Sequence, residues 1–255
     1  MSASFALSAI SALFSCVCCF LVLQRWWHKR RPHLLAWGLG LLLYAIGTVS
    51  QVILALVWNP TAFALWYWCG AIMVAPVLGQ GAVYLLWRRG SIARNLNMAL
   101  LLVAAMTLPW TLFFTEFNAD AWRAGHDMTT LFKDHHDEDG ALVAGIMRGG
   151  MSGTVRFFSP VMNSWGTLTL VGGALYSAHL FRRKQILPNR VYGNVLIALG
   201  GLLPAFGGLM LRLGDPSFKY LGEMCGVALI FAGFLVASQE APNPSPALRA
   251  AERPV

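Results

Sequence analysis

Charged residues are scarce in this chain. Asp, Glu, Lys and Arg make up 12% of its 255 residues, against 57% hydrophobic residues. A soluble domain carries about 25% charged residues. The mean hydropathy, +0.58, is clearly positive. The scarcity of charge excludes an ordinary soluble domain and predicts an integral membrane protein. The length suits one bundle of about six to eight membrane-spanning helices.

Catalytic motifs are missing as well. The chain has no HExxH pattern, no GxSxG pattern and no phosphate-binding loop, which are the signatures of common hydrolases and nucleotide-binding enzymes. It also has no CxxC pair, and its cysteines lie inside apolar runs, where cysteine behaves as a small hydrophobic residue. We therefore predict that the protein is not an enzyme.

Acidic residues are fewer than basic ones, which leaves a formal net charge of +8. A basic chain can bind nucleic acid, but here the Lys and Arg residues are dispersed in short clusters beside apolar runs. That distribution is typical of membrane topology and not of a phosphate-binding face. No nucleic-acid partner is expected.

Several apolar runs are long enough at helical rise to cross a bilayer. The sequence predicts an all-α membrane protein, a seven-transmembrane-helix bundle that forms one domain over 1–238. An outer loop over 118–158 is expected to end in a short interfacial helix over 141–151. The polar tail at 239–255 is expected to be disordered. The predicted spans are about 3–23, 33–57, 62–87, 96–117, 160–181, 190–212 and 218–238.

Basic residues indicate the orientation of these spans. Thirteen of the nineteen Lys and Arg residues fall on one predicted side of the membrane, which the positive-inside rule assigns to the cytoplasm. The N-terminus is then outside and the C-terminus is cytoplasmic. WCG at 68–70 is echoed by MCG at 224–226. This echo indicates either a 3+1+3 arrangement of parallel repeats or a chance likeness.

The sixth predicted span is rich in glycine and contains Pro204. A proline inside a helix removes one backbone donor and clashes with the preceding turn, so we expect a kink there. Small residues let neighbouring helices approach closely, and the seventh span carries a GxxxG pattern. The residues expected to serve helix packing are Gly200, Gly201, Gly207, Gly208, Gly222 and Gly226.

Polar groups inside the membrane are costly and often functional. Glu223 is the only carboxylate inside a predicted span, and Arg212 closes the preceding span on the same side. Two interpretations follow: an Arg212–Glu223 ion pair that joins the two helices, or a proton- or substrate-handling role for Glu223. The candidate residues of a substrate pathway are Glu223, Gln80, Asn163, Tyr84 and Pro204.

Histidines offer further alternatives. The outer loop holds imidazole and carboxylate groups that could bind zinc or copper. A solvated acidic loop is the competing interpretation, because the loop lacks the i, i+4 spacing of two ligands on one helix face. His179 lies inside a span, and with His33 it could hold a haem between two helices. The candidate metal ligands of the loop are His126, His135, His136 and Asp137.

The chain resembles an uncharacterised family of bacterial seven-helix integral membrane proteins in four stretches. These are RPHLLAWGLGLLLYAIGTVSQ (31–51), LGQGAVYLL (78–86), GTLTLVGGALYSA (166–178) and GVALIFAGFLVA (226–237). The resemblance implies a multi-pass protein of a prokaryotic cytoplasmic (inner) membrane and implies no assigned activity. Retinal chemistry is not expected, because the last predicted span has its lysine, Lys219, at its outer end and not midway.

Packing residues are thus abundant in the spans, whereas polar groups are few. The sequence favours a non-enzymatic membrane module, an accessory or structural subunit that binds a partner protein, lipid or pigment. Membrane lipids are expected partners, with another membrane protein or complex as a further one. The first alternative is a small-solute transporter of 3+1+3 design. The second is a metal or redox protein that uses the outer loop or His179, with zinc, copper or haem as its cofactor.

Overall fold

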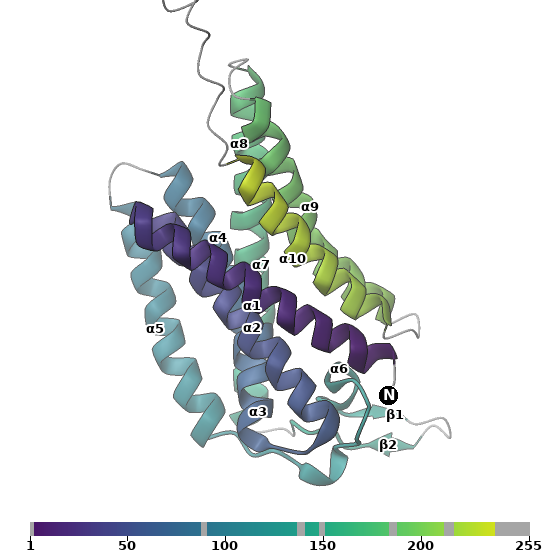
Figure 1. The fold of residues 1–255 in the computed structure, drawn as a ribbon. Coiled ribbons are helices and arrows are strands. Elements are labelled where there is room, and N and C mark those ends of the chain that lie inside the picture. Colours follow the sequence, from purple (N-terminus) through teal and green to yellow (C-terminus); the bar gives the residue numbers. More distant parts are fainter. Residues whose placement is uncertain are drawn as a thin grey trace, which may run out of the picture.

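A computed structural model of the chain describes residues 3–87, 91–136, 141–147, 151–183, 188–211 and 217–237. Helices dominate these ranges (Figure 1). Five of them are regular: α1 (Ala3–Lys29), α2 (Pro32–Leu56), α5 (Ile92–Phe113), α9 (Pro188–Leu211) and α10 (Ser217–Ala237).

Two further helical segments each contain a stretch of π-helix. The first comprises α3 (Pro60–Leu65), η1 (Trp66–Met73) and α4 (Val74–Leu86), and the second comprises α7 (Met151–Thr167), η3 (Leu168–Gly172) and α8 (Gly173–Arg183). The WCG at 68–70 therefore lies in a π-helix, whereas the MCG at 224–226 lies in regular α10. The sequence echo does not extend to local helix geometry.

Five helices of the described residues are long and apolar enough to cross a membrane. They are Ser8–Lys29, Pro32–Leu56, Pro60–Leu86, Ile92–Phe113 and Lys219–Ala237, and Val191–Pro204 is a shorter apolar helix. Each lies within one of the predicted apolar runs or extends it by a few residues. The helix that begins at Met151 starts well before the predicted boundary near Pro160, and it contains this proline.

Local sequence explains the two sharp turns at the ends of α2. Proline disfavours helical backbone in the residue before it, and Arg31, which precedes Pro32, is extended with φ −89° and ψ 132°. At the other end, the side chain of Asn59 accepts a hydrogen bond of 2.9 Å from Ala62 N and caps α3, with Pro60 at the first helical position.

Helices α9 and α10 pack closely through glycines. A Cβ atom placed on Gly200 would lie 2.6 Å from the carbonyl oxygen of Gly226, and one on Gly226 would lie 3.0 Å from Cδ of Pro204. A Cβ atom placed on Gly201 would lie 3.1 Å from Cδ2 of Leu170 in η3. Because these glycines have no side chain, the backbones of the two helices can meet. The surroundings of Gly207 and Gly208 lie outside the described residues, and Gly222 is half-buried.

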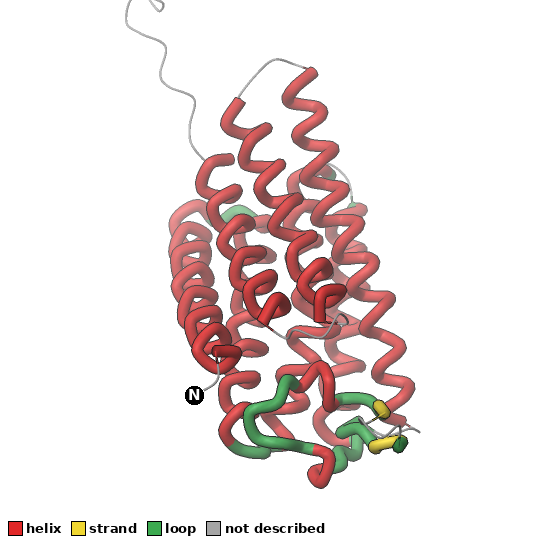
Figure 2. Tube along the Cα trace, turned by 90° about the vertical axis from the view of Figure 1, so that its right-hand side faces the viewer, coloured by secondary structure: helices red, strands yellow, loops and turns green. Residues whose placement is uncertain are grey.

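The outer loop folds against one end of the bundle, where strands and loops gather (Figure 2). It contains η2 (Ala119–Ala121), α6 (Met128–Leu131), β1 (His135–His136) and β2 (Leu142–Val143). The two strands are antiparallel, with His135 opposite Val143. The expected interfacial helix over 141–151 is wrong: β2 occupies its start, and Ile146 and Met147 that follow are completely buried.

Two apolar clusters fill the space between the elements. One joins α1, α2, α4, η3, α9 and α10, and includes Val22, Leu41, Leu78, Ile197 and Val227. The other lies beneath the outer loop, because Met128, Leu131, Ile146 and Met147 bury their side chains against α3 and η1. The indole N–H of Trp122 also donates to Leu54 O at 2.9 Å. These apolar residues of the loop are therefore part of the core.

Candidate functional site

A buried cluster of charges lies where the outer loop meets α10. The ammonium of Lys219 lies 3.1 and 3.0 Å from the two carboxylate oxygens of Asp127. Its distance to Oε1 of Glu223, one helical turn further along α10, is 3.9 Å. Lys219 is 5% exposed and Asp127 7%. We call Asp127, Lys219 and Glu223 the ion cluster.

Helix capping positions Asp127. This residue precedes α6, and its carboxylate accepts hydrogen bonds from Thr129 N at 2.6 Å and from the Thr129 hydroxyl. Burial by itself would raise the pKa of Asp127, but the ammonium of Lys219 and the hydrogen bonds from Thr129 and Tyr220 more than offset this, so the pKa is lowered. Asp127 is therefore a carboxylate at neutral pH.

Helix spacing positions the other two members of the cluster. Lys219 and Glu223 are four residues apart in α10 and share one face. Among the described residues, the cluster holds one cation and two carboxylates, with Lys219 bound closely to Asp127. Glu223 thus carries a charge that Lys219 compensates only partly. The side chain of Glu223 is 20% exposed, so holding this charge is costly to the extent that the carboxylate is removed from water.

Neutral polar side chains extend the cluster across the bundle. Tyr220 lies close to Asp127 and Ser8 and interacts with both. The amide of Gln51 donates to Ser8 Oγ at 3.1 Å, and its oxygen accepts from the indole N–H of Trp66 at 3.1 Å. This polar chain connects the loop, α10, α1, α2 and η1, and it lies beneath the loop at one end of the bundle.

A buried tyrosine interacts electrostatically with Glu223. Tyr44 from α2 lies near both Glu223 and Ser11 of α1. Its hydroxyl and that of Ser11 are buried, and neither makes a hydrogen bond within the part of the chain that the structure describes. Buried polar atoms are nearly always satisfied. Tyr44 and Ser11 lie close enough to interact with each other, so these two hydroxyls by themselves do not define a ligand site.

The other residues predicted for a pathway lie elsewhere. Gln80 is buried and donates to Ala93 O at 2.6 Å, which ties α4 to α5. Asn163 donates to Ala71 O in η1 at 2.6 Å, and so ties α7 to the π-helix. Both amides satisfy backbone carbonyls of another helix, the usual use of such residues in a bundle. Tyr84 is half-buried in α4.

Arg212 lies outside the described residues, so the predicted Arg212–Glu223 ion pair stays a prediction. Among the described residues, the cation near Glu223 is Lys219. Sequence inspection missed this lysine as a partner and treated Asp127 as part of a solvated acidic loop, which is wrong for a residue 7% exposed. The available signals were the i, i+4 spacing of Lys219 and Glu223 and the position of Asp127 before the short helical run Met128–Leu131.

The predicted metal and haem ligands are spread out. His126 is exposed, and Asp137 and the side chains of His135 and His136 lie outside what the structure describes. In the described ranges, no three His, Cys, Asp or Glu residues form a group that could hold a metal ion. His33 packs edge-on against Trp37 at 5.7 Å, and His179 is exposed on α8. The metal and haem hypotheses stay predictions without a specific observation in their favour.

The long apolar helices with a buried ion cluster at one end define the class: an all-α, multi-pass membrane protein. Comparison with known proteins finds no match among protein-family models, curated proteins or solved structures. The resemblance to bacterial seven-helix proteins stays a prediction. The function has to be inferred from the ion cluster and from the exposed helix faces.

Proposed function

We propose that this protein is a seven-span carrier of a prokaryotic inner membrane that moves a small solute together with a proton. Glu223 is the residue on which the proton resides. The observation that supports this function best is the charge imbalance of the ion cluster, where Lys219 is bound to Asp127 and compensates Glu223 only partly.

Two physical arguments favour a working role for Glu223 over a purely structural one. An ionisable group in a membrane span is costly, and it is retained mainly at ion and substrate pathways. A buried ion pair is also weak evidence of stabilisation, because desolvation offsets most of the attraction. Lys219 and Asp127 already join α10 to the loop without Glu223. Glu223 is a second carboxylate, and a proton can neutralise it. Such a group suits a site that couples the movement of a proton to the movement of a solute.

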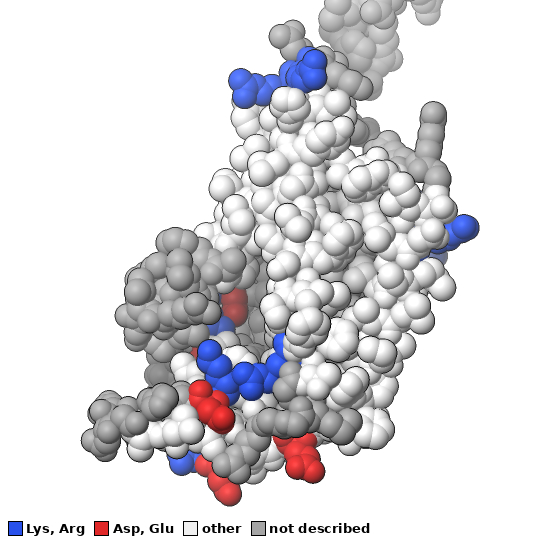
Figure 3. All heavy atoms as spheres, turned by 180° about the vertical axis from the view of Figure 1, so that it is seen from behind, with Lys and Arg blue, Asp and Glu red and all other residues white. Residues whose placement is uncertain are grey.

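Seven spans and an outside N-terminus belong to this proposal. The segment Met151–Arg183 and helix α9 supply the two spans beyond the five long apolar helices. The proposed orientation places the outer loop and the ion cluster at the outer surface. On the face in Figure 3, a broad uncharged surface covers the helices, and acidic side chains lie only in the lower half. This distribution agrees with a membrane-embedded middle.

Proton movement into proteoliposomes tests the proposal while the identity of the solute is still open. Liposomes that contain the protein and an internal pH-sensitive dye are energised by a potassium diffusion potential, with pools of amino acids, sugars or organic acids outside. We expect one pool to drive proton entry, and Glu223→Gln to abolish it with little change in thermal stability. Glu116→Gln, at an exposed acid just before the loop, is the control.

Two results contradict the carrier. One is the absence of proton entry with every pool in the wild-type protein. The other is proton entry that Glu223→Gln leaves unchanged. A large loss of thermal stability in Glu223→Gln would instead support a structural ion cluster.

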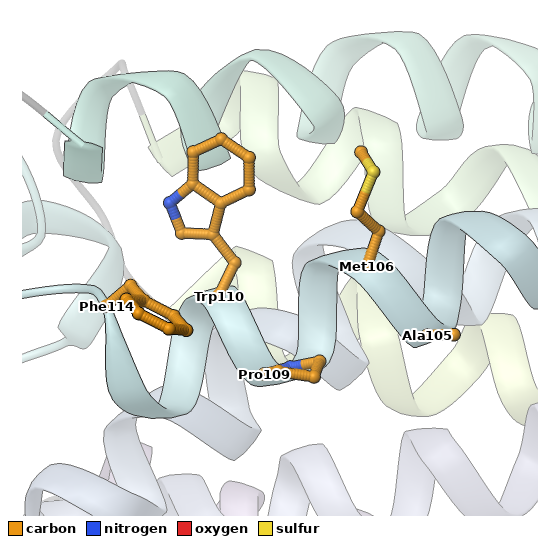
Figure 4. Close-up of a pocket in the computed structure, with 5 residues that line it drawn as sticks. All are labelled: Ala105, Met106, Pro109, Trp110 and Phe114. Carbon is orange, nitrogen blue, oxygen red and sulfur yellow. The ribbon is translucent and has the colours of Figure 1, made fainter.

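A second candidate is the accessory module, and helix α5 favours it. This helix is the least buried of the five long apolar helices and lies at the edge of the bundle (Figure 1). It carries an apolar groove of about 270 Å³, lined by Ala105, Met106, Pro109, Trp110 and Phe114 (Figure 4). The indole N–H of Trp110 is buried and has no hydrogen-bond partner among the described residues.

A groove variant separates this candidate from the carrier. Native mass spectrometry of protein released from its own membrane with a mild detergent should show a bound protein partner or pigment. Ala105→Trp, which fills the groove, should release it, whereas Leu102→Trp, on an exposed position of the same helix, should not. A bare 27.9 kDa chain or a simple homo-oligomer would exclude the accessory module.

A further inference from the structure

A stacked arginine lies at the end of α1 that is far from the ion cluster. The guanidinium carbon of Arg30 is 4.2 Å from the ring centre of Trp27 and 4.9 Å from that of Trp26. The two indoles themselves meet edge to face, with ring centres 6.1 Å apart. Stacking on two indole rings restricts the motion of a side chain that is otherwise flexible.

Backbone geometry brings Arg30 over these rings. Arg30 has φ +49°, in the left-handed region that non-glycine residues rarely adopt. Its N–H still donates to Trp26 O at 2.7 Å, and the extended Arg31 before Pro32 then turns the chain into α2. The left-handed residue folds the Arg30 side chain back over the last turn of α1. An unusual backbone conformation that positions one side chain often serves a site.

The guanidinium of Arg30 is available to bind an anion. Arg30 is exposed, and no carboxylate pairs with it in the part of the chain that the structure describes. Its neighbours Lys29 and Arg31 are exposed cations. A guanidinium has five N–H donors at the edge of its plane, and because Arg30 is exposed, donors that do not face the indoles are available to a ligand. A flat fork of donors matches the oxygens of a phosphate.

The position of Arg30 indicates where that phosphate comes from. The apolar helix Ser8–Lys29 ends one residue before it, so Arg30 lies at the boundary between hydrocarbon and water. Trp27 is 63% exposed, as expected of an indole in the interfacial belt of a membrane protein. Lipid phosphates lie at this level. From this geometry we infer that Arg30, on its platform of Trp26 and Trp27, binds the phosphate of an anionic phospholipid headgroup.

Charge makes the site selective for anionic lipids. Phosphatidylglycerol has a phosphate with no cation of its own, whereas the phosphate of phosphatidylcholine is neutralised by choline. Lys29 and Arg31 add attraction for the net charge of the former. This inference is independent of the carrier proposal, because it uses no residue of the ion cluster.

Lipid retention measured by native mass spectrometry tests the inference. Delipidated protein is incubated with phosphatidylglycerol or phosphatidylcholine, and the fraction that retains lipid is measured over a range of lipid concentrations. We expect the wild type to retain phosphatidylglycerol preferentially and Arg30→Gln to weaken that retention about tenfold, as loss of a charge-assisted hydrogen bond does. Arg30→Lys, which keeps the charge but loses the planar fork, should fall between them.

Matched variants make the outcome decisive. Arg94→Gln removes an exposed arginine near the start of α5 and should leave retention unchanged. Trp27→Leu keeps every charge but removes half of the platform, and it should weaken retention. Equal retention by wild type and Arg30→Gln, or equal retention of both lipids by the wild type, would overturn the inference. Displacement of the lipid by millimolar inorganic phosphate would reassign the site to free phosphate.

Discussion

The ammonium of Lys219 lies within 3.1 Å of both carboxylate oxygens of Asp127, although the two residues are 92 positions apart in the chain. This ion pair links the outer loop to the start of α10. Because both side chains are almost fully buried, each depends on the other to compensate its charge.

Removal of Asp127 should therefore destabilise the protein strongly. Asp127→Asn leaves the buried ammonium of Lys219 with Glu223 alone, at 3.9 Å, and breaking a buried pair on one side costs about 3–5 kcal/mol. Denaturant unfolding in detergent measures this loss. Asp120→Asn, at an exposed acid of the same loop, should change little. Combining Asp127→Asn with Lys219→Met and Glu223→Gln removes all three charges and should recover much of the stability. Failure to do so would mean that the pair is not the cause.

Acid should weaken the same contact. The pKa of Asp127 is lowered from its ordinary value of 3.8 by Lys219 and by its hydrogen bonds, in spite of burial, which acts in the opposite direction. The folded protein therefore binds fewer protons at this site than the unfolded chain does. The resulting stability is complete above pH 3.8 and is lost as the pH falls through the lower, folded-state pKa.

Thermal unfolding between neutral and strongly acidic pH measures that dependence. The wild type should lose more stability than Asp127→Asn, whose amide does not titrate at this position. Parallel curves for the two proteins would show that Asp127 does not carry the acid sensitivity.

The contact between α9 and α10 should not tolerate a side chain at Gly200. A Cβ there would lie 2.6 Å from Gly226 O and 2.8 Å from Ile230 N, and these backbone atoms cannot move aside without separating the helices. We expect Gly200→Ala to cost about 1–3 kcal/mol, as overpacking does. Gly172→Ala is the matched helical control, because a Cβ there meets nothing within 4 Å. Equal stability of the two variants would refute the close contact.

Loss of the Gln51 side chain should destabilise the protein, because two buried polar groups hydrogen-bond to its amide. Gln51→Leu leaves the indole N–H of Trp66 and the hydroxyl of Ser8 without the amide that both contact at 3.1 Å. A buried donor left unsatisfied costs about 1–3 kcal/mol. Thermal unfolding, together with the fluorescence of the tryptophans, reports the change. The same substitution at Gln24, which is exposed on α1, should have no comparable effect.

Sequence periodicity and composition located the helices well, because membrane spans are a local property. A run such as Pro32–Leu56 is apolar over its whole length, and any membrane helix formed there must bury or shield its own backbone. Local rules also explain the turns, since Pro32 and Asn59 act on adjacent residues. The π-helices were not predicted, because η1 and η3 have no distinguishing apolar pattern.

The candidate site was predicted only in part. Glu223 was recognisable as a carboxylate in an apolar run, whereas its relation to Asp127 was not. The loop residues Met128, Ile146 and Met147 gave no periodic signal, yet they bury completely against α3 and η1. Asn163 and Gln80, expected along a pathway, bond to Ala71 and Ala93 on other helices.

By itself the sequence determined that this is a membrane protein and which stretches form its long apolar helices, because transfer of a helix into lipid depends on the residues of that helix alone. The helix ends were less well determined, since the helix that contains Pro160 begins at Met151. Only the tertiary structure decided which polar groups meet. Asp127 and Lys219 become neighbours because the loop buries its apolar residues over one end of the bundle. Among the described residues, Glu223 is left with only a partial counterion, because Lys219 lies closer to the carboxylate of Asp127.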